Sequence, residues 1–519
     1  MDPLHTAGAT EILDAVERLK QAIWKKRPIL GEIMQKHGNK VLSDYSLDFM
    51  DVNKAPGLDE RKPEFIALVE ELVEGRLGKE VALGVAHQLR KLPLVSTADH
   101  HASIDHPFWV NANIISGIPM YENPDPDLKY LIVFSFASVS VNNASGYSRG
   151  VLFNGGTNGS KNLIRLPILP DKLKMSVVYG TRPYSREDLT KAELELQKKE
   201  KNGEIALGRG DRIRLFLEDK FGSDIVLRSS NLCSQISRIN YRFWPKLFHA
   251  GNNIPSGGNP VPDLIYLDIE TIVTQLLLRT HLKQVDSLIY KFLFDPTFMA
   301  VIPQYFNNLA GAFSLEKGWG TYMFWGVNEK QRRVGTKLEN GILVFQDSDV
   351  RIPWNPQAIF DALKNKQIFP GMLVCYLMVS LYYGMKCLGG FCQVHDLTVI
   401  KEAWRAMLQK LGNTTEADAV VPVQTKELGG DGMVLAYLKT PTGDYVPATG
   451  IDMALEIGDT SFGNYVSLSK RVTLTEMMSS MLPEMYTVLY PESDRDPELL
   501  KVKPEEIFHA SGLKKKLTV

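Results

Sequence analysis

Residues 96–113, STADHHASIDHPFWVNAN, hold the densest group of chemically versatile side chains in the sequence. Three of the ten histidines, His100, His101 and His106, fall within this short segment, and Asp99 and Asp105 are interleaved with them. Neutral imidazole and carboxylate are the usual protein ligands of zinc, iron and manganese. The segment therefore predicts a site for a divalent metal ion, which could be any of these three metals.

The spacing of these side chains suggests their roles. On an extended chain successive side chains alternate, so Asp99, His101 and Asp105 face one side and His100 and His106 the other. A loop after a short strand would let both sets converge at the strand's carboxyl end, where sites in α/β folds often lie. We expect His101, Asp105 and His106 to bind the ion, and His100 and Asp99 to act in catalysis.

Three further polar residues are candidates for binding a small polar substrate. Asn111 and Asn113 follow the histidines and would share one face of an extended segment. His249 precedes the turn-rich stretch GNNIPSGGN, which suits the rim of a pocket.

The histidine-aspartate segment favours a metal-dependent enzyme, and hydrolysis needs the least beyond the ion itself. A non-haem iron oxidoreductase is the alternative at the same site, since two imidazoles and one carboxylate also bind iron. The same residues could instead only cap and hydrogen-bond a turn. In that case a non-catalytic protein that binds a small molecule is the remaining interpretation.

A metal-free serine hydrolase is a separate alternative. Residues 146–150, GYSRG, match the GxSxG pattern in which Ser148 would be the nucleophile, with His249, His281 or His395 as base. That chemistry needs a helix after the serine, whereas the sequence continues with the loop-like VLFNGGTNGSKN. A glycine-rich turn therefore explains the motif better.

Two acidic residues, Asp268 and Glu270, stand in the apolar run DLIYLDIETIVTQLLL. Acidic side chains in so apolar a setting need partners. Either residue could supply a ligand or a base if this run lies against the histidine-aspartate segment.

The overall composition excludes several classes of protein. The chain has 519 residues with 44% hydrophobic residues and a net charge of -1, which excludes disorder and argues against nucleic-acid and membrane partners. Residues 372–385 are apolar but too short and polar for a membrane span, and no signal peptide is visible. Four cysteines fit a reducing compartment, so we expect a cytoplasmic protein.

The pattern of residues along the chain predicts an α+β fold. Residues 1–91 form a helical N-terminal segment, and residues 92–260 a β-rich region with long Gly/Asn loops and strands at 131–141, 175–179 and 213–217. Residues 261–412 are mainly helical, with buried helices at 263–278 and 372–386, and residues 413–519 are mixed. The best candidate boundary is 252–262, although all regions could form one globular unit.

Overall fold

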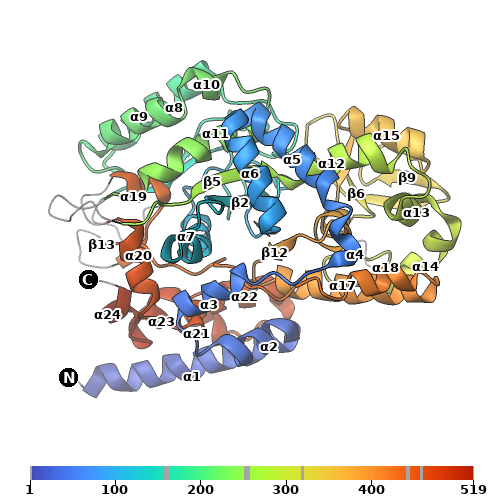
Figure 1. Cartoon of the computed structure of the whole chain (residues 1–519). Helices are drawn as coiled ribbons and strands as arrows, with labels where there is room; N and C mark the ends of the chain where they lie inside the picture. Colours follow the sequence, from blue (N-terminus) through green and yellow to red (C-terminus); the bar gives the residue numbers. More distant parts are fainter. Residues whose placement is uncertain are drawn as a thin grey trace.

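The computed structural model describes residues 3–156, 163–249, 258–316, 321–439, 445–455 and 460–517 (Figure 1). The predicted α+β class is confirmed, because helices dominate and several separate sheets accompany them. Within the described residues, no helix is long and apolar enough to cross a membrane. Residues 252–257 of the predicted boundary, and residues 157–161 of the Gly/Asn loop, lie outside the described part.

The central element is a four-stranded parallel sheet with the strand order β12-β1-β2-β5. Its strands are β1 (Leu94–Ser96), β2 (Tyr130–Ser135), β5 (Asp263–Asp268) and β12 (Lys386–Leu388). The predicted regions 92–260 and 261–412 each contribute two of these strands. The carboxyl ends of all four strands therefore meet at one edge of the sheet, which is where parallel sheets usually place their sites.

Both faces of this sheet are buried. Val133 and Tyr266 point into one apolar cluster together with helix α7 (Pro107–Glu122), whereas Ile132 and Ile265 point into another. The second cluster includes helices α5 (Lys62–Leu77) and α6 (Lys79–Lys91). Strands covered on both faces have nearly continuous apolar sequences, as here.

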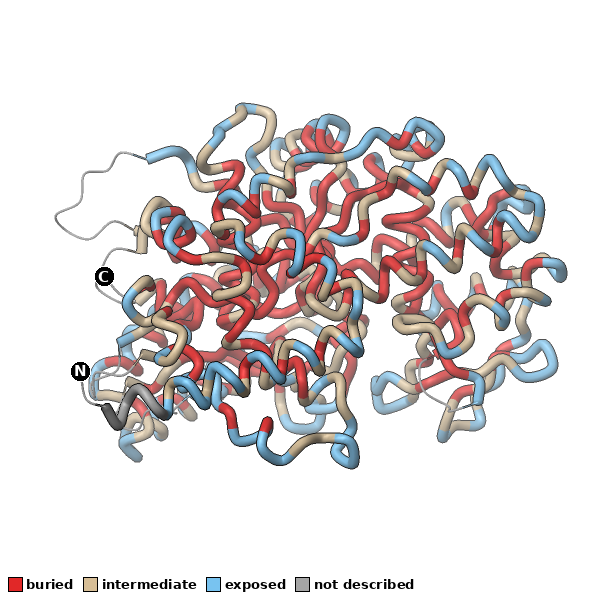
Figure 2. Tube along the Cα trace, turned by 90° about the horizontal axis from the view of Figure 1, so that it is seen from below, coloured by how far each residue is buried: buried red, intermediate tan, exposed pale blue. Residues whose placement is uncertain are grey.

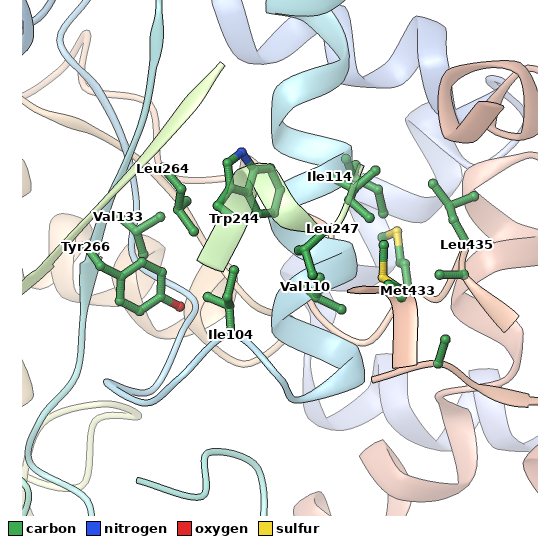
Figure 3. Close-up of a cluster of buried hydrophobic side chains, with 14 of the residues drawn as sticks. Ile104, Val110, Ile114, Val133, Trp244, Leu247, Leu264, Tyr266, Met433 and Leu435 are labelled. Atoms are coloured by element: carbon green, nitrogen blue, oxygen red, sulfur yellow. The ribbon is translucent and has the colours of Figure 1, made fainter. Parts of the chain in front are cut away.

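The cluster on the α7 side extends well beyond the sheet (Figure 3). Val110 and Ile114 of α7 pack with Trp244, and Met433 and Leu435 of the C-terminal region join the same cluster. Figure 2 shows buried segments through the middle of the molecule and exposed ones around its periphery.

The remaining helices surround the sheet. The N-terminal ones are α1 (Pro3–Lys26), α2 (Pro28–His37), α3 (Leu42–Leu47) and α4 (Pro56–Asp59). The central ones are α8 (Arg186–Lys201), α9 (Arg209–Lys220), α10 (Asp224–Leu227), α11 (Leu232–Phe243), α12 (Ile269–Leu276), α13 (Leu288–Phe294), α14 (Pro296–Phe306), α15 (Pro356–Lys364) and α16 (Met372–Tyr376). The C-terminal ones are α17 (Gln393–Lys410), α18 (Thr414–Ala419), α19 (Gly450–Leu455), α20 (Phe462–Ser469), α21 (Leu474–Ser479), α22 (Leu482–Leu489), α23 (Pro504–Ala510) and α24 (Leu513–Leu517).

Four small antiparallel sheets complete the fold among the described residues. Two are hairpins, namely β3 (Gly150–Asn154) with β4 (Leu163–Pro167), and β13 (Tyr437–Lys439) with β14 (Tyr445–Pro447). The other two contain β6 (Phe324–Val327), β7 (Arg333–Val334) and β11 (Ile368–Pro370), and β8 (Thr336–Glu339), β9 (Ile342–Phe345) and β10 (Arg351–Pro353).

Several predicted strands are wrong. Residues 213–217 lie in α9, where Ile213, Phe216 and Leu217 recur at helical spacing and are buried. Residues 175–179 form no strand, and β2 ends at Ser135, well before residue 141. The short alternating stretches in these segments thus do not determine a strand.

Two predicted long helices are also wrong in part. Residues 263–268 form β5, because a strand buried on both faces has the same continuous apolar sequence as a buried helix. The helix at 372–386 is α16 followed by a π-helical turn, Leu377–Tyr382. Gly384 then adopts a positive φ of 70°, and the chain enters β12.

Candidate functional site

The histidine-aspartate segment leaves β1 at the carboxyl edge of the parallel sheet. The amide of Phe136 donates to the Asp99 carbonyl (2.9 Å), and the His101 amide donates to the Phe136 carbonyl (2.8 Å). The pairing of β1 with β2 thus continues as far as His101. Since the chain is extended here, Asp99 and His101 both approach Tyr266, whereas His100 packs on the other side against Trp109.

Asp99 is completely buried and is held by two donors. Its Oδ2 accepts hydrogen bonds from Asn113 Nδ2 (2.9 Å) and from the Tyr266 hydroxyl, while its Oδ1 makes no hydrogen bond with any described residue. Burial raises the pKa of Asp99 to about 6, against the lowering effect of the Tyr266 and Asn113 hydrogen bonds. Asn113 is therefore a partner of Asp99 in the core.

The two predicted substrate-binding asparagines lie in helix α7, so the extended segment expected for them is wrong. Pro107 occupies the first turn, where proline favours a helix, and His106 is the N-cap residue. The Asn111 side chain is fully buried, and its Oδ1 accepts from the amides of Leu435 (2.8 Å) and Ala436 (2.9 Å). Asn111 thus fixes a C-terminal segment against α7.

His100 is the partly exposed histidine of the segment. Its Nδ1 lies 3.2 Å from Asn143 Oδ1 and 3.1 Å from Ser145 Oγ, and its Nε2 makes no hydrogen bond with the described residues. Burial, assisted by Arg333, lowers the pKa of His100 to about 4, so the ring is neutral at pH 7. The Ser145 hydroxyl therefore lies next to Nδ1, which Asn143 also contacts, and a neutral imidazole could act as a base through whichever nitrogen carries no proton.

The predicted ligands Asp105 and His106 have other partners. Asp105 Oδ2 accepts from the Leu152 amide (2.7 Å), and burial raises the pKa of Asp105 well above its usual value. His106 Nδ1 accepts from the Phe108 amide (3.3 Å), and burial lowers the pKa of His106 to about 3. Among the described residues, the structure does not gather these two with His101 into one group of ligand atoms.

A different group surrounds His101. The ligand atoms of His101, Cys233 and Asp268 all lie within 4.8 Å of one another, so this triad could hold a metal ion. His101 follows β1, Cys233 stands in the first turn of α11 and Asp268 is the last residue of β5. All three side chains are buried, with exposed fractions of 3% or less.

Hydrogen bonds fix the orientation of each member of the triad. His101 Nδ1 lies 2.7 Å from Ser135 Oγ, and His101 Nε2 lies 3.0 Å from the Cys233 carbonyl oxygen. The Cys233 thiol makes one long contact, of 3.8 Å, with the Val178 carbonyl. Burial lowers the pKa of His101 to about 4 and raises that of Cys233 well above its usual value, so both are neutral at pH 7.

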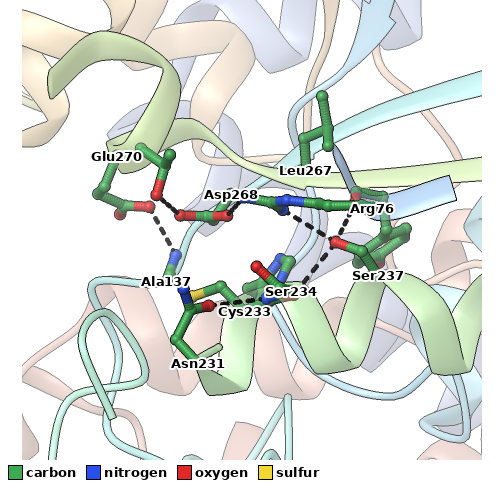
Figure 4. Close-up of polar contacts among 12 residues, drawn as sticks. Arg76, Ala137, Asn231, Cys233, Ser234, Ser237, Leu267, Asp268 and Glu270 are labelled. Atoms are coloured by element: carbon green, nitrogen blue, oxygen red, sulfur yellow. Dashed lines mark hydrogen bonds and ion pairs between the residues drawn. The ribbon is translucent and has the colours of Figure 1, made fainter. Parts of the chain in front are cut away.

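A buried ion pair adjoins the triad (Figure 4). Arg76 of α5 donates to Asp268 Oδ1 (2.7 Å) and to Ser237 Oγ (2.9 Å). Burial alone would raise the pKa of Asp268, but the positive charge of Arg76, the nearby His101 and the hydrogen bonds from Thr271 and Arg76 together outweigh it, and the pKa falls to about 2. Asp268 is therefore ionised, with its charge balanced by Arg76.

Glu270 stands beside Asp268 at the start of α12. Its carboxylate accepts hydrogen bonds from the amides of Ala137 (2.8 Å) and Ser138 (2.9 Å), and it is completely buried. Burial raises the pKa of Glu270 to about 7, although these two bonds act in the opposite direction. A carboxylate that titrates near neutral pH is suited to general acid-base chemistry.

The serine of the GxSxG pattern is part of the core. Ser148 is fully buried and its Oγ donates to the His101 carbonyl (2.7 Å). The residues after it form strand β3, not a helix. His281, one proposed base, is bonded to Ser287 and Tyr383. Ser145, which the motif does not indicate, has a partly exposed hydroxyl in the same loop.

His249 lies apart from these contacts, and its Nδ1 is 2.9 Å from Thr460 Oγ1. The stretch that suggested a pocket rim, residues 250–257, is outside the described part.

Comparison of the chain with protein-family models and with curated proteins found no match.

Proposed function

We propose that the protein is a metal-dependent hydrolase for a small polar substrate, with the ion bound by His101, Cys233 and Asp268. The observation that carries this proposal is the convergence of three ligand atoms within 4.8 Å at the carboxyl edge of the parallel sheet. A bound ion would supply a Lewis acid and lower the pKa of a coordinated water. A cytoplasmic location and the absence of nucleic-acid partners remain predictions from the sequence.

The number and type of ligands support a catalytic ion. Structural zinc sites usually have four protein ligands, whereas catalytic sites have three and keep one position for water or substrate. A thiolate suits zinc or iron and disfavours manganese, which prefers oxygen ligands. The iron oxidoreductase predicted as the alternative requires two imidazoles and one carboxylate, whereas this triad has a single imidazole, so the hydrolase is favoured.

Binding requires two local changes. His101 must give up one of its hydrogen bonds, since Ser135 and Cys233 occupy both ring nitrogens. The Cys233 thiol must lose its proton, because the thiolate is the form that binds metal. With Arg76 already beside Asp268, the thiolate supplies the negative charge that a divalent ion needs.

Glu270 is the residue that we assign as general base. It adjoins Asp268, and its pKa of about 7 allows it to accept a proton at neutral pH. The hydrogen bonds from Ala137 and Ser138 hold the carboxylate in place.

The test is hydrolysis of small ester and phosphate-ester substrates by the purified protein. We expect prolonged chelation to abolish the activity and zinc or iron to restore it. Glu270→Gln should retain the ion and lose activity by roughly a hundredfold to ten-thousandfold. Glu498→Gln, at an exposed site, is the control. Activity that survives complete metal removal would contradict the proposal.

One contact favours a second candidate, a metal-free serine hydrolase. Ser145 Oγ lies 3.1 Å from His100 Nδ1, and the partly exposed ring is neutral. In this alternative Ser145 replaces Ser148 as the nucleophile and His100 is the base. A fluorophosphonate probe that labels the protein, but not its Ser145→Ala variant, would support it.

A further inference from the structure

A pocket with a volume of about 200 Å³ opens near the C-terminal helices, away from the metal triad. It lies between hairpin β13–β14, helices α22 and α23, and the start of α7. Its lining combines aromatic rings with carboxylates, namely Phe108, Tyr437, Tyr445, Phe508, Glu484 and Glu505.

The aromatic rings form an ordered wall. Tyr437 and Phe508 stack with their centroids 4.4 Å apart and an interplanar angle of 27°. Lys514 Nζ already lies 5.6 Å from the centroid of the Tyr445 ring, so a cation contacts an aromatic face at this site. The faces of aromatic rings carry partial negative charge and attract cations.

The acidic side chains near the pocket lack basic partners. Glu484 is an exposed residue whose carboxylate forms no hydrogen bond or ion pair with any described residue, and the partial burial of this carboxylate raises its pKa. Behind it, burial raises the pKa of Asp431 to about 7, and the neighbouring charges of Asp99 and Glu484 add to this shift.

Two buried acids elsewhere in the molecule are neutralised by arginine, whereas Asp105 and Glu270 accept hydrogen bonds from backbone amides instead. Asp268 pairs with Arg76 at 2.7 Å, and Asp452 pairs with Arg209 at 2.5 Å. Within the described part of the chain, no basic side chain forms an ion pair with Asp99, Asp431 or Glu484. The pocket lining therefore combines two carboxylates, those of Glu484 and Glu505, with aromatic faces, and Lys514 is a basic side chain that contacts one of these faces.

We infer that this pocket binds a small organic cation, such as a quaternary ammonium compound, with Glu484 balancing its charge and the rings of Tyr437 and Phe508 contacting its alkyl groups. An inorganic ion would gain little from the aromatic wall, and a neutral ligand would leave Glu484 unpaired. This inference does not depend on the metal triad.

Calorimetric titration with choline tests the inference, because 3,3-dimethylbutan-1-ol has nearly the same shape and no charge. We expect choline to bind and the neutral compound to bind roughly threefold to thirtyfold more weakly, or not at all. Glu484→Gln and Tyr437→Leu should each weaken choline binding by a similar factor. Glu498→Gln, an exposed change on the following segment, should leave it unchanged.

Circular dichroism of each variant establishes that it is folded, and the comparison of the two ligands uses the wild-type protein alone. Equal affinity for the charged and neutral compounds would overturn the inference. No choline binding at concentrations up to about 10 mM, or full binding by Glu484→Gln, would overturn it as well.

Discussion

His101 Nε2 lies 3.0 Å from the carbonyl oxygen of Cys233, and this contact fixes the proton on the imidazole. A carbonyl oxygen can only accept, so Nε2 carries the hydrogen of the neutral ring. Nδ1 then accepts from Ser135 Oγ, at 2.7 Å. The two residues of the proposed metal site are therefore already bonded to each other without an ion, and Nδ1 is the nitrogen with the lone pair.

Metal affinity should rise with pH. Burial raises the pKa of the Cys233 thiol well above its usual value, so binding must release the thiol proton throughout the neutral range. His101, with a pKa of about 4, is already neutral and releases none. We expect zinc affinity, measured by competition with a chromophoric chelator, to increase about tenfold per pH unit between pH 6 and 8. A flat profile would rule out Cys233 as a ligand.

Asp268→Asn should destabilise the fold strongly. The change leaves the Arg76 charge buried without a counter-charge, which costs about 3–5 kcal/mol in comparable sites. Glu218→Gln, which breaks the half-exposed pair with Arg186, should cost no more than about 1 kcal/mol. Urea unfolding measures both. Similar losses for the two variants would contradict the assignment of Asp268 to a buried ion pair.

Asp431 should make the protein less stable as pH rises from about 4 to 7. Its pKa is raised to about 7 in the folded protein, above the unfolded value near 3.9, so the folded state binds the proton more tightly. The stabilisation is therefore full below pH 4 and is lost as pH rises through 7. Thermal unfolding of Asp431→Asn should show a weaker pH dependence across this window than the wild type. An unchanged dependence would show that Asp431 titrates normally.

Replacing each of the two serines near His100 and His101 with alanine should change the stability of the fold by different amounts. Ser148→Ala removes the donor to the His101 carbonyl and should destabilise the fold by about 1–3 kcal/mol. Ser145→Ala removes a partly exposed hydroxyl and should change the stability by less than about 0.5 kcal/mol. The denaturant concentration at the midpoint of unfolding, measured for each variant, checks both expected changes. A stable Ser148→Ala variant would contradict the structural role given to that residue.

The sequence predicted which side chains face the same way at the candidate site better than it predicted which residues form that site. Alternation along an extended chain correctly placed Asp99 and His101 on one side and His100 on the other. Asp268 was also suggested, because an acidic residue in an apolar run needs a partner. Its actual partner, Arg76, comes from α5, which no pattern near Asp268 indicates.

Cys233 could not have been predicted as a ligand. It lies 132 residues after His101 in the chain, and no second cysteine or histidine follows it at a spacing typical of a metal site. Only the packing of α11 against β5 brings it to the carboxyl edge of the sheet. Strand β5 itself was predicted as a helix, so the position of Asp268 at a strand end was hidden as well.

The metal content of the purified protein tests the central claim most directly. We predict about one zinc or iron ion per chain in the wild type and in Cys392→Ala, and none in Cys233→Ala. Cys392 is the control because it lies outside the triad. A wild-type protein that binds no ion after incubation with zinc or iron, or a Cys233→Ala variant that retains it, would contradict the account.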